Sequence, residues 1–223
     1  MFAAGNVPAL RTALADYCLL LTKGYATKSS LKLVGDRFSL TERQRLAVMR
    51  SGCSDQQLTG RSDRCIDVED LAGRSIALDG YNVLITVEAA LGGGVLLEGR
   101  DGCYRDLASI HGTYRKVSET IPAARLIGEF LGAKGVDGVY WLLDRPVSNS
   151  GRLKTLFHDV AEEHGWDWQV ELVMSPDAVL IKSDQIVASS DSVILDGCHR
   201  WANLARCIVQ EAVTDTWVID LSM

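Results

Sequence analysis

The sequence predicts an α/β protein in which a mainly parallel sheet is covered by helices and preceded by a small helical module. From about residue 70 onward, short apolar strands alternate with helical segments, the pattern of a parallel sheet with helical crossovers. The charge changes at a similar point. Residues 1–64 hold 10 Lys and Arg against 5 Asp and Glu, whereas residues 65–223 hold 13 against 24. We therefore expect a basic helical module over 1–64 and an α/β domain over 65–223.

The bulk composition is that of an ordinary globular protein, with 47% hydrophobic and 23% charged residues in a chain of 223. No apolar run approaches the ~18 residues that a membrane helix needs, and the N-terminal segment lacks the basic start and apolar stretch of a signal peptide. The six cysteines form no C-x-x-C pair, so free thiols in a reducing compartment are expected. We expect a cytoplasmic protein without membrane contact, whose oligomeric state the sequence leaves open.

Two helices are predicted in the N-terminal module, at residues 8–23 and 39–52. The first has leucines at helical spacing and is followed by a glycine that can end it. The second opens with Ser39 and Glu42, which fit the S-x-x-E capping box. The rest of the module is predicted to be irregular, with a loop over 25–38 and a polar linker over 53–70.

The α/β domain is predicted to contain short strands separated by helices and one hairpin. The strands are expected at 75–79, 138–144, 168–174, 185–191 and 216–221. The helices are expected at 81–91, 104–118, 122–133, 150–165 and 199–213. The segment 95–106 is predicted to form the hairpin, because Asp101-Gly102 is a favourable turn pair.

Three of the predicted strands end on an aspartate: Asp79, Asp144 and Asp191. In open parallel sheets, functional groups gather at the carboxyl ends of the strands. Unpaired carboxylates are costly to bury there, and three together raise one another's pKa values unless a cation lies between them. A hard divalent ion, Mg²⁺ or Mn²⁺, resolves this conflict and supports phosphoryl chemistry. The sequence therefore predicts a metal site at this edge of the sheet.

Two motifs carry a resemblance to a known superfamily. "IALDGYNVL" resembles the first strand of the PIN/NYN nucleases, and "VASSDSVILD" resembles their later strand-end motif. Nearly all of residues 10–212 also resemble a prokaryotic family known only as a domain of unknown function, which combines a helical module with "DGYN", "DG-x-x-RD", "D-x-P-x-S-x-SG" and "SSDSVILD". The resemblance implies a PIN-like, Rossmann-like three-layer fold and a metal-dependent endoribonuclease, acting on RNA or another single-stranded nucleic acid.

The resemblance also implies roles for individual residues. Asp79 matches the acid of the first strand, and Asn82 matches the asparagine that orients the site. Asp191 matches the acid after the two serines, Asp196 a possible further acid, and Asp144 the carboxylate of a middle strand. All but Asn82 are expected as metal ligands.

Two assignments extend the predicted site. The helix-borne acid of the superfamily has two candidates here, Glu88 and Asp106. A phosphate site is predicted at the start of the helix near residue 150, where backbone N–H groups can bind an anion and nearby side chains can add charge-assisted contacts. The side chains expected to do so are Arg145, Ser148, Ser150 and Arg152.

Each acid also has a purely structural alternative. Asp79 and Asp191 could cap the helices that follow them. Asp144 precedes Arg-Pro and Asp196 precedes Gly, so both could belong to turns. The basic module could contact nucleic acid, or its cations could form a solvated surface.

The functional alternatives follow from the same residues. Besides a metal-dependent nuclease, the sequence is compatible with a PIN-like module whose site is incomplete and which holds RNA or a protein without cutting. Another phosphotransfer or nucleotide-binding enzyme is disfavoured, because the chain has no G-x-x-x-x-G-K-[ST] motif and no G-x-G-x-x-G after a strand.

Overall fold

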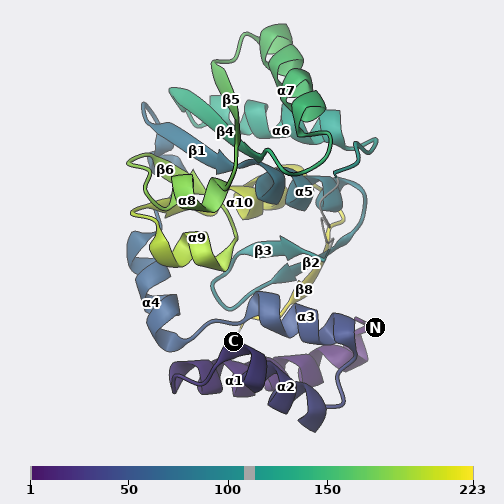
Figure 1. Ribbon diagram of the computed structural model, residues 1–223. Coiled ribbons are helices and arrows are strands. Elements are labelled where there is room, and N and C mark those ends of the chain that lie inside the picture. Colours follow the sequence, from purple (N-terminus) through teal and green to yellow (C-terminus); the bar gives the residue numbers. More distant parts are fainter. Residues whose placement is uncertain (1, 108–113, 223) are drawn as a thin grey trace. The chain divides into compact units, whose positions relative to one another are not determined.

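The structure, a computed structural model, describes residues 2–107 and 114–222 (Figure 1). The chain divides into two compact units. The first combines residues 1–63, 95–107 and 217–223, and the second combines 64–94 and 108–216.

The second unit is built on a five-stranded sheet in the order β5-β4-β1-β6-β7, in which all neighbouring strands are parallel. The strands are β1 (Ser75–Asp79), β4 (Gly138–Asp144), β5 (Trp168–Val173), β6 (Ile186–Ala188) and β7 (Trp201–Ala202). The predicted α/β architecture and the pairing of β1 with β4 and with β6 are therefore confirmed. Strand β6 is shorter than the strand predicted at 185–191 and ends three residues before Asp191. Both faces of β1 are covered, so its residues Ile76 to Asp79 are all buried.

Helices cover both faces of this sheet (Figure 1). Helix α10 packs on α5 and α6, α5 packs on α6, and α6 packs on α7, while α8 packs against β1, β4 and α9. Their bounds are η2 (Val68–Leu71), α5 (Gly80–Leu91), α6 (Thr120–Ala133), α7 (Ser150–His164), α8 (Pro176–Leu180), α9 (Ser192–Gly197) and α10 (Leu204–Ala212). The buried rings of Trp141, Phe157 and Trp168 hold α7 against β4 and β5, with centroids 4.3–5.9 Å apart.

The order of the strands creates a switch point beside β1. From β1 the chain moves to β4 and β5 on one side, then returns to β6 and β7 on the other. Ligands of open α/β sheets bind outside the carboxyl ends of the strands at such a point. Here the switch point lies between the ends of β1 and β6.

The first unit joins four helices to a three-stranded sheet of order β3-β2-β8. Its elements are η1 (Ala4–Asn6), α1 (Val7–Thr22), α2 (Thr27–Arg37), α3 (Glu42–Ser51), α4 (Asp55–Arg64), β2 (Val95–Glu98), β3 (Tyr104–Asp106) and β8 (Trp217–Asp220). Leu10 and Leu14 of α1, Val48 of α3, Leu97 of β2 and Ile219 of β8 share one buried core.

The sequence analysis placed a single domain boundary near residue 64, whereas each unit of the structure combines segments that are separate in the sequence. The predicted hairpin at 95–106 is present, and β8 lies within the strand predicted at 216–221. Both were expected in the α/β domain, yet β8 pairs in parallel with β2 and the three strands belong to the unit of the N-terminal helices. Strand pairing between segments more than 100 residues apart leaves no local signal in the sequence.

Several predicted elements of the first unit are wrong. Helices α2 and α4 occupy the segments expected to be a loop and a linker. The capping box of α3 is formed by Thr41 and Gln44, not by Ser39 and Glu42. A contact from the next helix supports α2: the Arg45 side chain of α3 donates to Lys32 O at 3.3 Å and to Asp36 at 2.8 Å.

Two predicted helices of the α/β domain also need correction. The helix expected at 104–118 is wrong where the chain is described, because strand β3 occupies its start and residues 114–118 are not helical. Residues 108–113 lie outside the described part of the chain. The last helix begins at Leu204, because Trp201 and Ala202 extend the sheet as β7. Among residues 2–107 and 114–222, no helix has the length and apolar character needed to cross a bilayer.

A buried ion cluster stabilises the first unit. Asp101, in the β2–β3 turn, accepts hydrogen bonds from Arg61 at 2.5 Å and from Arg105 at 2.6 and 2.8 Å. The Asp101 side chain is only 2% exposed. Burial acts to raise the pKa of Asp101, but the two guanidinium groups outweigh it and lower the pKa to about 2.

We expect Asp101→Asn to destabilise the first unit by about 3–5 kcal/mol, because the substitution removes a buried negative charge that two buried arginines share. Native-state hydrogen exchange of the β2 and β3 amides measures this loss. Asp36→Asn is the matched control, because Asp36 is 52% exposed in its pairs with Lys32 and Arg45 and its loss should leave the unit far less affected. Equal losses in the two variants would contradict the importance of the buried cluster.

Candidate functional site

The site is centred on Asp79, at the carboxyl end of the central strand. Asp79 is 7% exposed and stands immediately before α5. Gly80 follows because α5 starts against β4: a Cβ at this position would lie 2.8 Å from Leu142 O and 2.6 Å from the Leu143 side chain. The capping alternative for Asp79 is not realised, since its side chain makes no capping hydrogen bond.

Two serines of the loop after β6 connect the strands across the switch point. The Ser189 hydroxyl donates to Asp79 Oδ2 at 2.7 Å and accepts from the Asp191 N–H at 2.9 Å. The Asn82 carbonyl oxygen accepts from the Ser190 N–H at 2.8 Å and from its hydroxyl at 3.0 Å. Asn82 therefore fixes the loop after β6 and contacts Ser190 instead of Asp79, which Ser189 orients.

Four aspartates share one electrostatic environment. Burial is the main cause that raises the pKa of Asp79 to about 7; the Ser189 hydrogen bond opposes it, and the charges of Asp191, Asp177 and Asp144 raise it further. The pKa of Asp144 is raised by partial burial and then by Asp177. The pKa of Asp177 is raised by partial burial and then by Asp191. Within the described residues, none of the four forms an ion pair with Lys, Arg or His. The charges of Asp144, Asp177 and Asp191 thus act on Asp79, whereas the convergence of the carboxylates in one pocket stays a prediction.

Asp177 is the acid that the sequence analysis missed. It lies in the first turn of α8, which is capped by Ser175 and packs against β1 and β4. The sequence did contain a signal for it, because Ser-Pro-Asp follows β5. Functional groups gather beyond the carboxyl ends of parallel strands, and this argument, which identified the other three aspartates, applies to β5 as well. Asp177 lies a few residues beyond the strand end, since the chain first turns back towards β1.

The structural alternatives for Asp191 and Asp144 are partly realised. Asp191 caps α9 through Oδ1, which accepts from the N–H groups of Val193 at 2.7 Å and Ile194 at 3.4 Å. Its Oδ2 makes no hydrogen bond to the described residues. Asp144 begins a turn, because its carbonyl accepts from the Val147 N–H at 3.2 Å. Neither role uses the whole carboxylate.

The remaining candidate acids lie in other environments. Asp196 is in the last turn of α9, five residues and about 7.5 Å along the helix axis from Asp191. Glu88 is buried in α5, where it accepts hydrogen bonds from Tyr114 and from Thr120, the latter at 2.6 Å. Asp106 belongs to the first unit and pairs with Arg50. None of the three is among the main causes of the raised pKa of Asp79.

The four residues of the predicted phosphate site have different surroundings in the structure. Arg145 donates to Leu172 O at 3.2 Å, and the buried Ser150 hydroxyl donates to Arg145 O at 3.4 Å. Both side chains therefore bind backbone carbonyls of the protein. Ser148 is exposed and its carbonyl accepts from Tyr114 N at 3.3 Å. Arg152 is exposed and lines a cavity beside α7.

Tyr81, two residues after Asp79, presents a buried hydroxyl. The side chain is 4% exposed, and its hydroxyl has no hydrogen-bond partner among the described residues. Burial and then the charge of Asp144 raise the pKa of Tyr81 to about 12, so the hydroxyl remains a donor at neutral pH. Its ring packs on Tyr114, with centroids 5.3 Å apart.

The donor chemistry of the four aspartates suits a hard divalent cation, because carboxylate oxygens are preferred ligands of Mg²⁺ and Mn²⁺. The four carboxylates are, however, less closely gathered and more exposed than the ligands of a preformed metal site. Among the described residues, no group of three or more His, Cys, Asp or Glu is placed so that it could hold a metal ion. Only Asp79 is buried, whereas Asp144 and Asp191 are partly exposed and Asp177 is exposed.

Comparison with known proteins gives the family. A family model described as "Domain of unknown function (DUF5616)" matches residues 68–207. The chain belongs to this family. The DUF5616 region contains the whole five-stranded sheet and all four aspartates, and a second model, "Protein of unknown function (DUF434)", matches residues 9–64.

An uncharacterized protein of Methanocaldococcus jannaschii is 30% identical to the chain over 186 residues, which are 83% of this chain and 88% of that protein. No solved structure matches the chain. The DUF5616 description assigns no activity.

We expect the second unit to lose stability as pH rises from about 4 to 7 in metal-free buffer. The pKa of Asp79 is higher in the folded state than in the unfolded chain, so folded protein keeps a proton that unfolded protein has released. A shift to about 7 corresponds to a loss of the order of 4 kcal/mol. Asp79→Asn should remove this loss and be more stable than the parent protein at pH 8, with little difference at pH 4.

Urea unfolding with EDTA, followed by tryptophan fluorescence, measures this effect. Four of the five tryptophans lie in the second unit, so the signal reports mainly on it. A parent protein that gains stability between pH 5 and 8, or an Asp79→Asn protein that is weaker at pH 8, would contradict the assignment.

Proposed function

We propose that the chain is a divalent-metal-dependent ribonuclease of the PIN/NYN kind, which cleaves single-stranded RNA internally. The observation that carries the proposal is Asp79, a buried carboxylate at a switch point, without a cationic partner in the described residues and in the field of three other aspartates. A side chain needed only for packing or hydrogen bonding would be more stable there as asparagine, because a buried unpaired charge is costly.

A cation would offset this cost. Mg²⁺ or Mn²⁺ would be held by Asp79 together with Asp144, Asp177 or Asp191, whose more exposed side chains have room to turn towards it. When bound, such an ion activates a water molecule for attack on a phosphodiester and stabilises charge on the phosphate and the leaving oxygen. The donor set contains oxygen only, which favours these ions over zinc.

The chain's own residues would prepare the site in three ways. Ser189 holds one oxygen of Asp79 and leaves the other for a ligand. Asn82 fixes Ser190 and so positions the loop that carries Asp191. The Tyr81 hydroxyl is a donor without a described partner, suited to a phosphate oxygen.

The motifs support the same chemistry. "DGYN" and "SSDSVILD" carry the resemblance to the PIN/NYN superfamily, and they contain Asp79, Asn82 and Asp191. The two motifs lie at the ends of neighbouring strands β1 and β6. The choice of RNA as substrate rests on this resemblance.

A second candidate function is a module that binds RNA or a protein partner without cutting. The open placement of the acids favours it, since no three potential ligands in residues 2–107 and 114–222 are close enough to hold a metal ion as they stand. The two functions differ in a direct observable, because a binding module would retain labelled RNA intact in the presence of Mn²⁺.

We expect purified protein to shorten a labelled single-stranded RNA pool when Mg²⁺ or Mn²⁺ is added, and to stop when EDTA is added. Asp79→Asn and Asp191→Asn should each lose at least about 100-fold in rate, because each substitution replaces a negatively charged ligand of the cation by a neutral amide. Asp184→Asn is the matched control: Asp184 is exposed at the amino end of β6, the opposite edge of the sheet, and should keep the parent rate.

Gel analysis of the products decides among the outcomes. Cleavage that persists in Asp79→Asn would place the activity elsewhere or in a contaminant. RNA that is retained but stays intact at every metal concentration would favour the binding module and reject the nuclease.

A further inference from the structure

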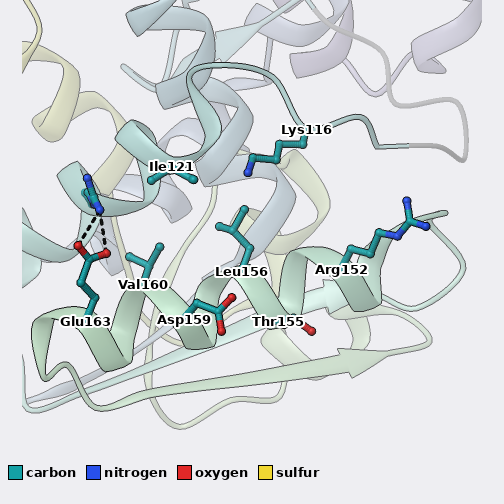
Figure 2. A pocket seen from close by; sticks show the side chains of 9 residues that line it. Lys116, Ile121, Arg152, Thr155, Leu156, Asp159, Val160 and Glu163 are labelled. Atoms are coloured by element: carbon teal, nitrogen blue, oxygen red, sulfur yellow. Dashed lines mark hydrogen bonds and ion pairs between the residues drawn. The ribbon is translucent and has the colours of Figure 1, made fainter.

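A groove runs between α6 and α7 in the second unit (Figure 2). It consists of two cavities of about 500 and 350 Å³, which share Lys116, Leu156 and Arg152 in their walls. One side is a single face of α7, whose lining residues are Arg152, Thr155, Leu156, Asp159, Val160 and Glu163. Figure 2 shows the Lys116 side chain reaching across towards Leu156.

The smaller cavity, which we call the α7 cationic pocket, is lined by Tyr114, Arg115, Lys116, Asn149, Arg152, Leu153 and Leu156. It has three cations and no acid, in a unit whose 12 Lys and Arg face 20 Asp and Glu. No hydrogen bond or ion pair joins these three cations to other described residues. In the larger cavity, by contrast, Arg125 is neutralised by Glu163 at 2.7 Å.

The pocket is supported by specific contacts. The Asn149 side chain donates to Tyr114 O at 3.0 Å, and Tyr114 N donates to Ser148 O at 3.3 Å. The Tyr114 hydroxyl is held by Glu88 and by Thr120, the latter at 2.8 Å. These bonds tie the segment that carries Arg115 and Lys116 to the start of α7, which carries Arg152.

The same contacts connect the pocket to the aspartates. Tyr114 packs on Tyr81, which is two residues from Asp79. Asn149, the residue before α7, is five residues beyond Asp144 at the end of β4. Tyr81 and Tyr114 are themselves buried, so they connect the two places through the core. A strand of nucleotides bound at the aspartates would instead reach the pocket over the exposed loop 145–149.

We propose that the α7 cationic pocket binds one unpaired nucleotide of a single-stranded RNA, as a subsite beside the aspartate site. Arg115, Lys116 and Arg152 bind its phosphate, and the sugar and base lie on Leu153, Leu156 and the Tyr114 segment. Charged side chains beside an apolar wall are the combination that recognises single strands, and the volume lies in the range of about 300–1,000 Å³ typical of small-molecule sites. A base inside a duplex cannot enter such a cavity. The subsite rests on the proposed function in taking RNA as the ligand.

The test is binding of a fluorescein-labelled 12-nucleotide uridine RNA to the full chain, measured by anisotropy in EDTA so that no metal-dependent cleavage occurs. Lys116→Ala and Arg152→Ala should each weaken binding at least about 5-fold at low salt. Each should also lower the slope of log affinity against log salt by about 0.7, the contribution of one phosphate contact to a single strand. Lys116→Arg should keep both the affinity and the slope.

Two controls match the variants in charge. Lys154→Ala removes a lysine of α7 that does not line either cavity, and Arg74→Ala removes an arginine next to the amino end of β1. Both should bind like the parent protein. A loss in the controls equal to that in Lys116→Ala and Arg152→Ala, or no loss in the latter two, would overturn the pocket. The proposed subsite would also be overturned if duplex RNA or a phosphopeptide competed for binding as strongly as the unlabelled uridine strand does.

Failure of the pocket and failure of the nuclease give different results. If Lys116→Ala loses binding while the parent protein never cleaves RNA, the subsite stands and the nuclease proposal fails. If the parent protein cleaves RNA and Lys116→Ala binds it unchanged, the nuclease stands and the subsite fails.

Discussion

The constraint on which the site depends is the placement of a carboxylate at the end of a strand that is covered on both faces. Asp79 is buried there by the packing of the sheet, and the only side-chain hydrogen bond it receives from the described residues is that of Ser189. Gly80 lets α5 begin against β4, and Asn82 fixes the loop that carries Ser189. The local structure thus preserves an unfavourable charge, which is the behaviour expected of a functional group and not of a packing residue.

Much of this could be predicted from the sequence, because it follows from local patterns. Apolar strands that end on aspartate, and helices that follow them, identify the sheet and place Asp79, Asp144 and Asp191 at one edge. What the sequence could not provide depends on distant contacts. The pairing of β8 with β2, the support of α2 by Arg45, and the return of α8 across β1 and β4 all join segments without a local signature. For the same reason Asn82 could be recognised as a site residue, but its partner Ser190 could not.

The distribution of charge changes the view of where a polyanion would bind. By sequence, the basic module of residues 1–64 is the obvious surface. In the structure many of its cations are engaged in ion pairs within the first unit, such as Arg11 with Asp220 and Arg45 with Asp36. The cations of the α7 cationic pocket have no such partners in the described part of the chain, although they belong to the more acidic unit. Net charge therefore describes the solvated surface, whereas uncompensated cations in a cavity indicate where a phosphate fits.

The central claim is that Asp79 and the neighbouring aspartates bind a divalent cation. The most direct test is a crystal of the protein soaked in Mn²⁺, with anomalous scattering recorded at a wavelength that identifies the metal. The account predicts a manganese peak within about 2.5 Å of a carboxylate oxygen of Asp79 and of at least one among Asp144, Asp177 and Asp191. An empty switch point in the soaked crystal, with Asp79 still hydrogen-bonded to Ser189 and manganese bound elsewhere or not at all, would contradict it.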